Sequence, residues 1–234
     1  MKDGRIKKGD KMKKRYLLLT IVLVMVLMLC GCKNKNAAEF KTEYEALNGQ
    51  VNSSGKEYRT ITIDENNPFE KVTAEEIVKK IENKETFYVY FGDELCPWCR
   101  SVIEKFIEKT KEYKIDKVYY VKIWDKDGNE VLRDKMALNE NGELETTVEG
   151  TEAYKKLLEY FDNVLSDYNL TDAEGNKVYC SEKRIFAPNF FYIEKGVTMK
   201  KIDGISQYQT DARGELTEEI LNEEDRIITE FFTE

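Results

Sequence analysis

Histidine is absent from the 234 residues of this chain. Its absence excludes Ser-His-Asp and Cys-His catalysis, zinc bound through imidazole, and imidazole acid–base chemistry near neutral pH. Proline is scarce as well, with three examples (Pro68, Pro97 and Pro188), so the place of each one is informative. Any chemistry must come from cysteine, carboxylate, tyrosine, lysine or serine side chains, and the five cysteines are considered first.

Positive charge is scarce outside the N-terminus. The chain has 37 Lys and Arg against 45 Asp and Glu, but eight of these basic residues and two of the acidic ones precede residue 32. The rest therefore carries 29 basic and 43 acidic side chains, a net charge of −14, without a local basic stripe. Such a body repels phosphate backbones, so no nucleic-acid partner is expected. Its length suits one domain, or one domain with an insertion.

The N-terminus has the pattern of an export signal. Basic residues up to Arg15 precede the run Leu17–Leu29, in which Thr20 is the one polar residue. This run is short for a membrane span, which needs about 20 residues, but it suits the apolar region of a signal peptide. Met12 begins a compact signal of its own, so the true start is Met1 or Met12.

The run ends in Leu29-Cys30-Gly31-Cys32, which resembles the lipobox of bacterial lipoproteins. The resemblance implies that residues 1–31 are removed as a signal peptide. It also implies that Cys32 is lipidated and anchors the chain at the extracytoplasmic face of the cell membrane, in the style of a Gram-positive lipoprotein. The chain departs from the pattern at Cys30, where Ala, Ser or Thr is more frequent. An uncleaved anchor and a plain secretory signal are the alternatives. Residues 32–57 are predicted to be a flexible tether.

From Tyr58 onward, strand and helix patterns alternate. The predicted strands are Arg59–Ile63, Phe87–Phe91 and Val118–Ile123, of which the second has the unbroken apolar pattern of a strand covered on both faces. A capping box of Thr73 and Glu76 starts one helix, and Cys96–Lys114 has the spacing of another.

The C-terminal part is predicted to contain a hairpin, Phe190–Ile193 with Val197–Ile202, and a final helix. Residues 124–187 are too long for a simple connection and form an insertion, with one helix whose apolar stripe runs from Tyr154 to Tyr168. The order predicts an α/β fold with a mixed sheet. Clusters of Asp, Asn and Gly in the insertion lack the ligand spacing of calcium loops and are interpreted as turns.

The strongest motif is Cys96-Pro97-Trp98-Cys99, directly after a predicted buried strand and at the start of an amphipathic helix. Pro97 suits the first helical position, which makes Cys96 the N-cap. Free N–H groups and the helix dipole then favour its thiolate, so the pKa of Cys96 should fall below about 8.5. Cys99 lies on the same helical face, close enough to form a disulfide or to attack a mixed one.

Strand, loop, CxxC and helix together resemble the thioredoxin superfamily across residues 58–234, the insertion excepted. The family places a cis-proline before its final hairpin, facing the CxxC, and Ala187-Pro188-Asn189 stands at that place. The resemblance implies a three-layer α/β fold, a cis Pro188, and an Ala187 backbone that pairs with a bound substrate strand. Pro97 and Trp98 would contact the substrate, as part of a motif closer to that of glutaredoxins. The lipoprotein context also resembles surface thioredoxin-like and bacteriocin-transport accessory proteins.

Two departures from the family concern charge. Thioredoxins bury an aspartate six residues before the first cysteine, and here that position is Tyr90. Asp93 and Glu94 are expected to lie exposed in the loop, although either could substitute. Trp98 brings no charge, so we expect a moderately depressed Cys96 pKa and a potential nearer the thioredoxin–glutaredoxin range than about −120 mV.

Cys180 remains outside the motif. It is interpreted as a small buried residue, with pairing to Cys96 or Cys99 as the alternative. A zinc site of these three cysteines is disfavoured because a second CxxC is lacking, and no metal or other cofactor is expected.

The sequence predicts a membrane-tethered thiol–disulfide oxidoreductase. Cys96 would attack a protein or peptide disulfide, and Cys99 would resolve the mixed disulfide. The motif leaves open whether the enzyme reduces or oxidises; a reductase needs a redox partner at the membrane. The alternative is a surface accessory module in which residues 124–187 bind a secreted peptide or a transporter.

Overall fold

The computed structural model describes residues 35–125 and 127–233. The predicted signal peptide and the predicted lipidation site at Cys32 lie outside the described residues. Within the described ranges, no helix is both long and apolar enough to cross a membrane. Residues Asn36–Glu234 make up one compact unit.

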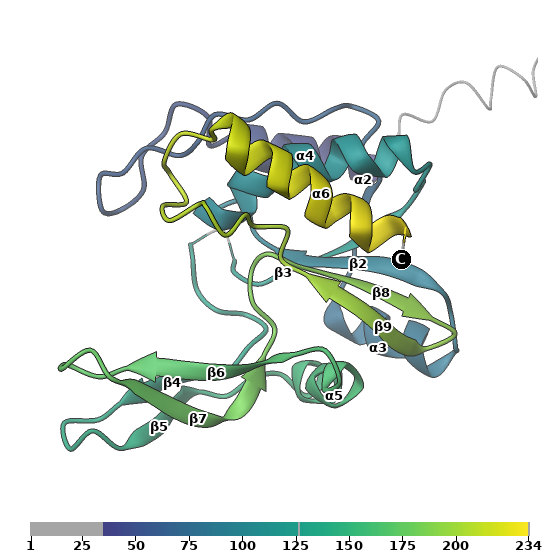
Figure 1. Cartoon of the computed structure of the whole chain (residues 1–234). Helices are drawn as coiled ribbons and strands as arrows, with labels where there is room; N and C mark the ends of the chain where they lie inside the picture. The colour runs from purple at the N-terminus through teal and green to yellow at the C-terminus, as the bar shows by residue number, and fades with distance from the viewer. Residues whose placement is uncertain (1–34, 126, 234) are drawn as a thin grey trace, which may run out of the picture. The chain divides into compact units, whose positions relative to one another are not determined.

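The centre of this unit is a mixed sheet of five strands in the order β1-β3-β2-β8-β9 (Figure 1). Strand β3 pairs in parallel with both β1 and β2, whereas β8 pairs antiparallel with β2 and with β9. The predicted mixed α/β fold is therefore confirmed. The strands are β1 (Phe69–Lys71), β2 (Phe87–Gly92), β3 (Val118–Lys122), β8 (Asn189–Glu194) and β9 (Val197–Ile202).

Helices cover both faces of this sheet, each over its own apolar cluster (Figure 1). The first face packs against α3 (Ala74–Glu82) and α5 (Glu152–Phe161). The second face packs against α2 (Lys35–Glu45), α4 (Pro97–Glu112) and α6 (Glu218–Thr233). We call them the α3 face and the α4 face.

Strand β2 shows why helices must cover both faces of the central sheet. Val89 and Phe91 belong to the cluster on the α3 face, and Tyr90 belongs to the cluster on the α4 face; all three have no exposed surface. Successive side chains of a strand point to opposite faces, so this apolar run buries both sides. The predicted capping box is also present, with the Thr73 side chain accepting from the Glu76 N–H and the Glu76 side chain accepting from the Thr73 N–H.

The insertion between β3 and β8 contains two hairpins, one before and one after α5 along the chain (Figure 1). The hairpins are β4 (Lys135–Leu138) with β5 (Leu144–Val148), and β6 (Ser166–Thr171) with β7 (Lys177–Arg184), each a separate two-stranded sheet. The predicted helix is shorter than its apolar stripe: it ends at Phe161, and Tyr168 lies on β6. Val164 and Leu165 still pack on the core, which explains why they extend the stripe.

The predicted flexible tether is wrong for the described part of residues 32–57. Residues Lys35–Glu45 form α2, and Ala37, Phe40 and Tyr44 are buried in the α4-face cluster or beside it. These three positions follow helical spacing, so the sequence did contain the signal.

The predicted strand Arg59–Ile63 is also wrong. Ile61 and Ile63 are buried as the alternation indicates, but their backbone groups bond to side chains rather than to a strand. The Ile61 N–H donates to Asn48 Oδ1 at 3.1 Å, and the Ile63 N–H donates to Glu45 Oε1 at 2.7 Å. A buried backbone can satisfy its donors in this way without joining a sheet.

Candidate redox site

The site begins where β2 ends and α4 starts. Cys96 is the N-cap of α4, with φ −76° and ψ 118°, and Pro97 occupies the first helical position. The Cys96 Sγ accepts a hydrogen bond from the Cys99 N–H at 3.2 Å. The local prediction is thus confirmed, because the proline fixes the helix start and leaves the first free N–H groups directed at the Cys96 sulfur.

The second sequence-predicted element lies against the first. The Ala187-Pro188 peptide bond is cis. The Cys96 thiol donates to the Ala187 carbonyl oxygen with a sulfur–oxygen distance of 3.4 Å. Two segments that are 91 residues apart in the sequence therefore meet at the Cys96 sulfur.

The two cysteines differ in the direction of their pKa shifts. Burial alone raises the pKa of Cys96, but hydrogen bonds from the Cys99 thiol and from the Cys99 and Trp98 N–H groups outweigh it, so the pKa of Cys96 lies below its ordinary value. The pKa of Cys99 lies well above its ordinary value, because that side chain is fully buried and next to Cys96. The lowered pKa favours the thiolate of Cys96, whereas the raised pKa keeps Cys99 a thiol at neutral pH.

Asp93 and Glu94 are buried, contrary to the expectation that they lie exposed in the loop. Burial, and then the charge of Glu94, raise the pKa of Asp93 to about 7. Its carboxylate accepts from the Leu95 N–H at 3.0 Å and the Trp124 N–H at 3.1 Å. Glu94 pairs with Lys122, its Oε1 lying 2.5 Å from Nζ. The site thus includes a buried carboxyl group that titrates near neutral pH.

Arg100, the residue after Cys99, holds the N-terminal segment against the site through hydrogen bonds. Its guanidinium is fully buried and donates to the Tyr44 carbonyl oxygen at 2.8 Å and to the Arg59 carbonyl oxygen at 2.6 Å. It also donates to Asn48 Oδ1 at 2.9 Å. Sequence reasoning missed this residue, since an arginine on an amphipathic helix is usually exposed.

A cavity of about 340 Å³ is lined in part by Ala187, the residue that the Cys96 thiol contacts. Trp98 and the Ala187-Pro188 bond line it together with Phe186, which is 37% exposed. Trp98 also packs in part on the α4-face cluster. Ser166 and Phe186 come from the insertion or its end, so the insertion contributes to one wall of this cavity. Its lining residues are Trp98, Ser166, Phe186, Ala187, Pro188, Asn189, Lys201, Asp203 and Ile205.

Cys180 lies on β7, outside the site. Its side chain is 3% exposed, and its Sγ lies 3.7 Å from the Val178 carbonyl oxygen of the same strand. All three described cysteines are free thiols. Among the residues that the structure describes, no cluster of Cys, Asp and Glu has the arrangement of a metal site.

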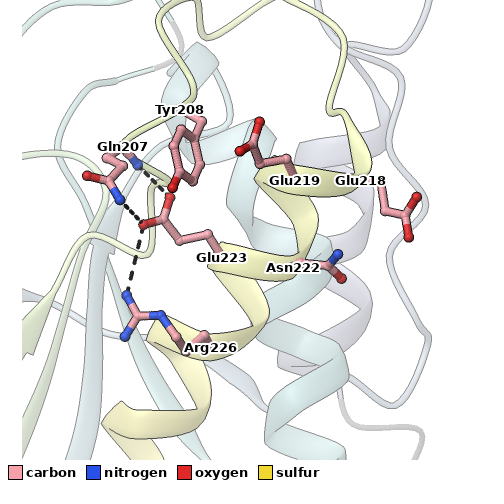
Figure 2. Close-up of a pocket in the computed structure, with 7 residues that line it drawn as sticks. All are labelled: Gln207, Tyr208, Glu218, Glu219, Asn222, Glu223 and Arg226. Atoms are coloured by element: carbon pink, nitrogen blue, oxygen red, sulfur yellow. Dashed lines mark hydrogen bonds and ion pairs between the residues drawn. The ribbon is translucent and has the colours of Figure 1, made fainter.

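A second depression, of about 580 Å³, lies between α6 and the loop that precedes it (Figure 2). At its centre the Glu223 carboxylate accepts from the Ser206 hydroxyl and from the Gln207 side-chain amide, the latter at 2.7 Å. Arg226 lies 3.9 Å from the same carboxylate. Because the chain's own donors already occupy Glu223, we interpret these contacts as fastening the loop to α6.

No protein-family model matches this chain, and no curated protein matches it either. The function of the site must therefore be inferred from its own geometry and chemistry.

Proposed function

We propose that this protein is a thiol–disulfide oxidoreductase with a thioredoxin-like fold, acting through Cys96 and Cys99. The observation that carries the proposal is the N-cap position of Cys96, where a lowered pKa favours its thiolate, beside the Ala187-Pro188 bond. The mixed sheet with helices on both faces is compatible with the fold.

The reaction begins at the Cys96 sulfur. Its thiolate attacks a substrate disulfide, forms a mixed disulfide, and releases one substrate sulfur as a thiolate, which takes up a proton. Cys99 then loses its proton and attacks the Cys96 sulfur, which releases the second substrate thiol and leaves a Cys96–Cys99 disulfide. Two electrons and two protons pass to the substrate. The reverse order oxidises a substrate dithiol.

The cavity beside Ala187 supports an extended peptide as the substrate. In this proposal the Ala187 backbone pairs with the peptide, and the apolar surfaces of Trp98 and Phe186 receive a side chain next to the substrate cysteine. Asp93 is proposed as the acceptor of the Cys99 proton, because this fully buried residue lies next to the motif, its carbonyl oxygen accepting from the Cys96 N–H at 3.2 Å, and its carboxyl group has a pKa of about 7.

The proposed location follows from the N-terminal motif. A lipid on Cys32 would anchor the protein at the extracytoplasmic face of a bacterial membrane. A reductase there needs electrons from the other side, so a membrane redox partner is part of the proposal.

The direct test is a redox titration of the full chain in graded glutathione buffers, followed by acid quench, alkylation and mass-spectrometric mapping. A two-electron transition confined to Cys96 and Cys99 is expected, and its midpoint separates a reductase from an oxidase. If the chain shows no such transition, or pairs chiefly through Cys180, the proposal is wrong.

A second candidate function is a surface binding module, supported by the hairpins of the insertion, where Val148 and Tyr179 are 41% and 52% exposed. Deleting the whole insertion would remove α5, whose Leu157 and Phe161 are part of the α3-face core. The discriminating variant is therefore Val148→Ser with Tyr179→Ser, which preserves the core. Unchanged turnover of a small disulfide with lost function in cells would favour this module.

A further inference from the structure

The α4 face holds a pair of buried tyrosine hydroxyls that leads from the N-terminal helix to the resolving cysteine. Tyr44 of α2 and Tyr90 of β2 have no exposed surface, and their hydroxyl oxygens lie 2.8 Å apart. The Tyr90 side chain lies in the same cluster as the fully buried Cys99 side chain, close enough for each to shift the pKa of the other. Tyr44, Tyr90 and Cys99 thus form one buried polar group on the α4 face.

Gly92 leaves the space that this arrangement needs. A Cβ atom at residue 92 would lie 2.1 Å from the Tyr90 hydroxyl oxygen, so the ring passes directly over the glycine backbone. The Tyr90 ring is stacked between two neighbours from the flanking strands, Tyr120 of β3 at 5.4 Å and Phe190 of β8 at 4.5 Å. The hydroxyl group is therefore held in one place by packing on both sides.

We propose that Tyr90 donates a hydrogen bond to the Cys99 sulfur and stabilises the thiolate that resolves the mixed disulfide, and that Tyr44 positions Tyr90 for this role. The proposal rests on the proposed function and deepens it. Tyr90 acts as a catalytic residue because it contacts the reacting sulfur, whereas Tyr44 acts through Tyr90 as a positioning residue.

The chemistry requires such a donor. In the resolving step Cys99 loses its proton inside a fully buried cluster, where an unpaired negative charge is costly. Burial keeps the pKa of Tyr90 well above its ordinary value, so its hydroxyl remains a donor at neutral pH. When the Tyr90 proton is directed at the sulfur, the Tyr44 hydroxyl is the one left to donate across the 2.8 Å contact, and this donation strengthens the bond from Tyr90 to sulfur. The same hydroxyls can rotate to accept from the Cys99 thiol before it ionises.

Tyr120 provides a matched control. It is fully buried in the same cluster and stacks on Tyr90, but its hydroxyl has no hydrogen-bond partner among the described residues. Tyr120→Phe therefore removes a hydroxyl of equal burial that does not reach Cys99.

The experiment follows the reaction of the reduced full chain with 5,5′-dithiobis(2-nitrobenzoate) by stopped flow, with Cys30, Cys32 and Cys180 replaced. Attack by Cys96 releases one thionitrobenzoate, and attack by Cys99 on the mixed disulfide releases the second. The two phases separate the two cysteines, and the pH dependence of the second phase reports the ionisation of Cys99.

Tyr90→Phe is expected to slow the second phase by about 10-fold to 100-fold at neutral pH, the usual effect of losing a hydrogen bond to a charged group. The midpoint of its pH profile should rise by about one unit or more. The first phase should stay within about twofold in Tyr90→Phe, and Tyr120→Phe should leave both phases unchanged, since neither variant alters the donors to Cys96.

Tyr44→Phe gives a second test should Tyr90→Phe fail to fold. It is expected to slow the second phase by about threefold, since one neutral hydrogen bond is lost. In the Tyr90→Phe background it should have no further effect, because Tyr44 acts through Tyr90.

Unchanged second phases in both variants would overturn the proposal and leave the oxidoreductase intact, and so would an equal slowing in Tyr120→Phe. A parent chain that releases no second thionitrobenzoate would instead overturn the proposed function.

Discussion

The two faces of the central sheet are built from the same strands but differ in chemistry. On the α3 face, β2 and β8 contribute Val89, Phe91 and Phe191 to an apolar cluster. On the α4 face, the alternate position of β2 places Tyr90 in a cluster that also contains Cys96 and Cys99. Polar atoms buried on the α4 face need partners, and those partners define the candidate site. The comparison indicates that the α3 face is an apolar core, whereas the α4 face combines a core with the candidate site.

The largest expected effect is the loss of disulfide turnover when a cysteine on the α4 face is replaced. Cys96→Ser should abolish disulfide turnover, because Cys96 is the N-cap whose thiolate is favoured, whereas the pKa of the fully buried Cys99 is raised well above its ordinary value. Cys99→Ser should trap substrates as mixed disulfides, since the resolving sulfur is lost. Mass spectrometry of alkylated cell extracts measures both. Cys180→Ala is the control and should leave turnover unchanged; recovery of no adducts with Cys99→Ser would contradict the mechanism.

The α3 face should respond in stability rather than in chemistry. Phe161 is fully buried and stacks on Phe191 with ring centroids 4.3 Å apart. Phe161→Ala is expected to lower the free energy of unfolding by about 3–5 kcal/mol, as a large cavity forms. Denaturant unfolding measures this free energy. Val148→Ala, at an exposed position, is the control and should lower it by less than about 0.5 kcal/mol. A changed Cys96 pKa in the folded Phe161→Ala protein would contradict the separation of the two faces.

The two faces should also differ in pH dependence, because the α4 face contains Asp93 with a pKa of about 7. This pKa is raised, so the folded chain holds the proton more tightly than the unfolded chain. The resulting loss of stability is absent below about pH 4, grows as the pH rises, and is complete above about pH 7. Asp93→Asn does not have this pH-dependent loss. Its free energy of unfolding at pH 8 should therefore exceed that of the parent by at most about 4 kcal/mol.

Asp93→Asn should also lower the pKa of Cys96 further, because the Asp93 charge raises it in the parent. Thiolate absorbance at 240 nm against pH measures this second effect. Glu224→Gln is the matched control: burial raises the pKa of Glu224 to about 7 too, so its stability should change in the same way without a change at Cys96. Equal effects of both variants on Cys96 would contradict the assignment.

The features that the sequence predicted correctly are those determined by short-range contacts. The N-cap cysteine depends on Pro97 and its neighbours, and the capping box depends on Thr73 and Glu76. Pro188 was located by its order relative to the final hairpin, and its cis bond agrees with that prediction.

The features that the sequence did not reveal depend on long-range packing. The burial of Asp93 follows from its bond to the Trp124 N–H, 31 residues away. The bond between the two tyrosine hydroxyl groups joins Tyr44 and Tyr90, which are 46 residues apart in the sequence. Such contacts appear once the folded helices bring distant residues together. The tether prediction fails for a different reason: Ala37, Phe40 and Tyr44 repeat at helical spacing, and this local signal is masked by the many polar residues around them.

The smallest effect that we predict concerns the attachment of the N-terminal segment to the α4 face. Arg100→Lys keeps the charge but loses the planar fork that reaches the carbonyl groups of Tyr44 and Arg59. We expect a loss of about 2 kcal/mol of stability and faster amide hydrogen exchange over residues 44–59. Arg226→Lys is the control, since its side chain is 57% exposed and its ion pairs contribute less than about 1 kcal/mol. Unchanged exchange in Arg100→Lys would show that the apolar contacts of α2 alone hold this segment, and Tyr44 would then stay beside Tyr90 without the arginine.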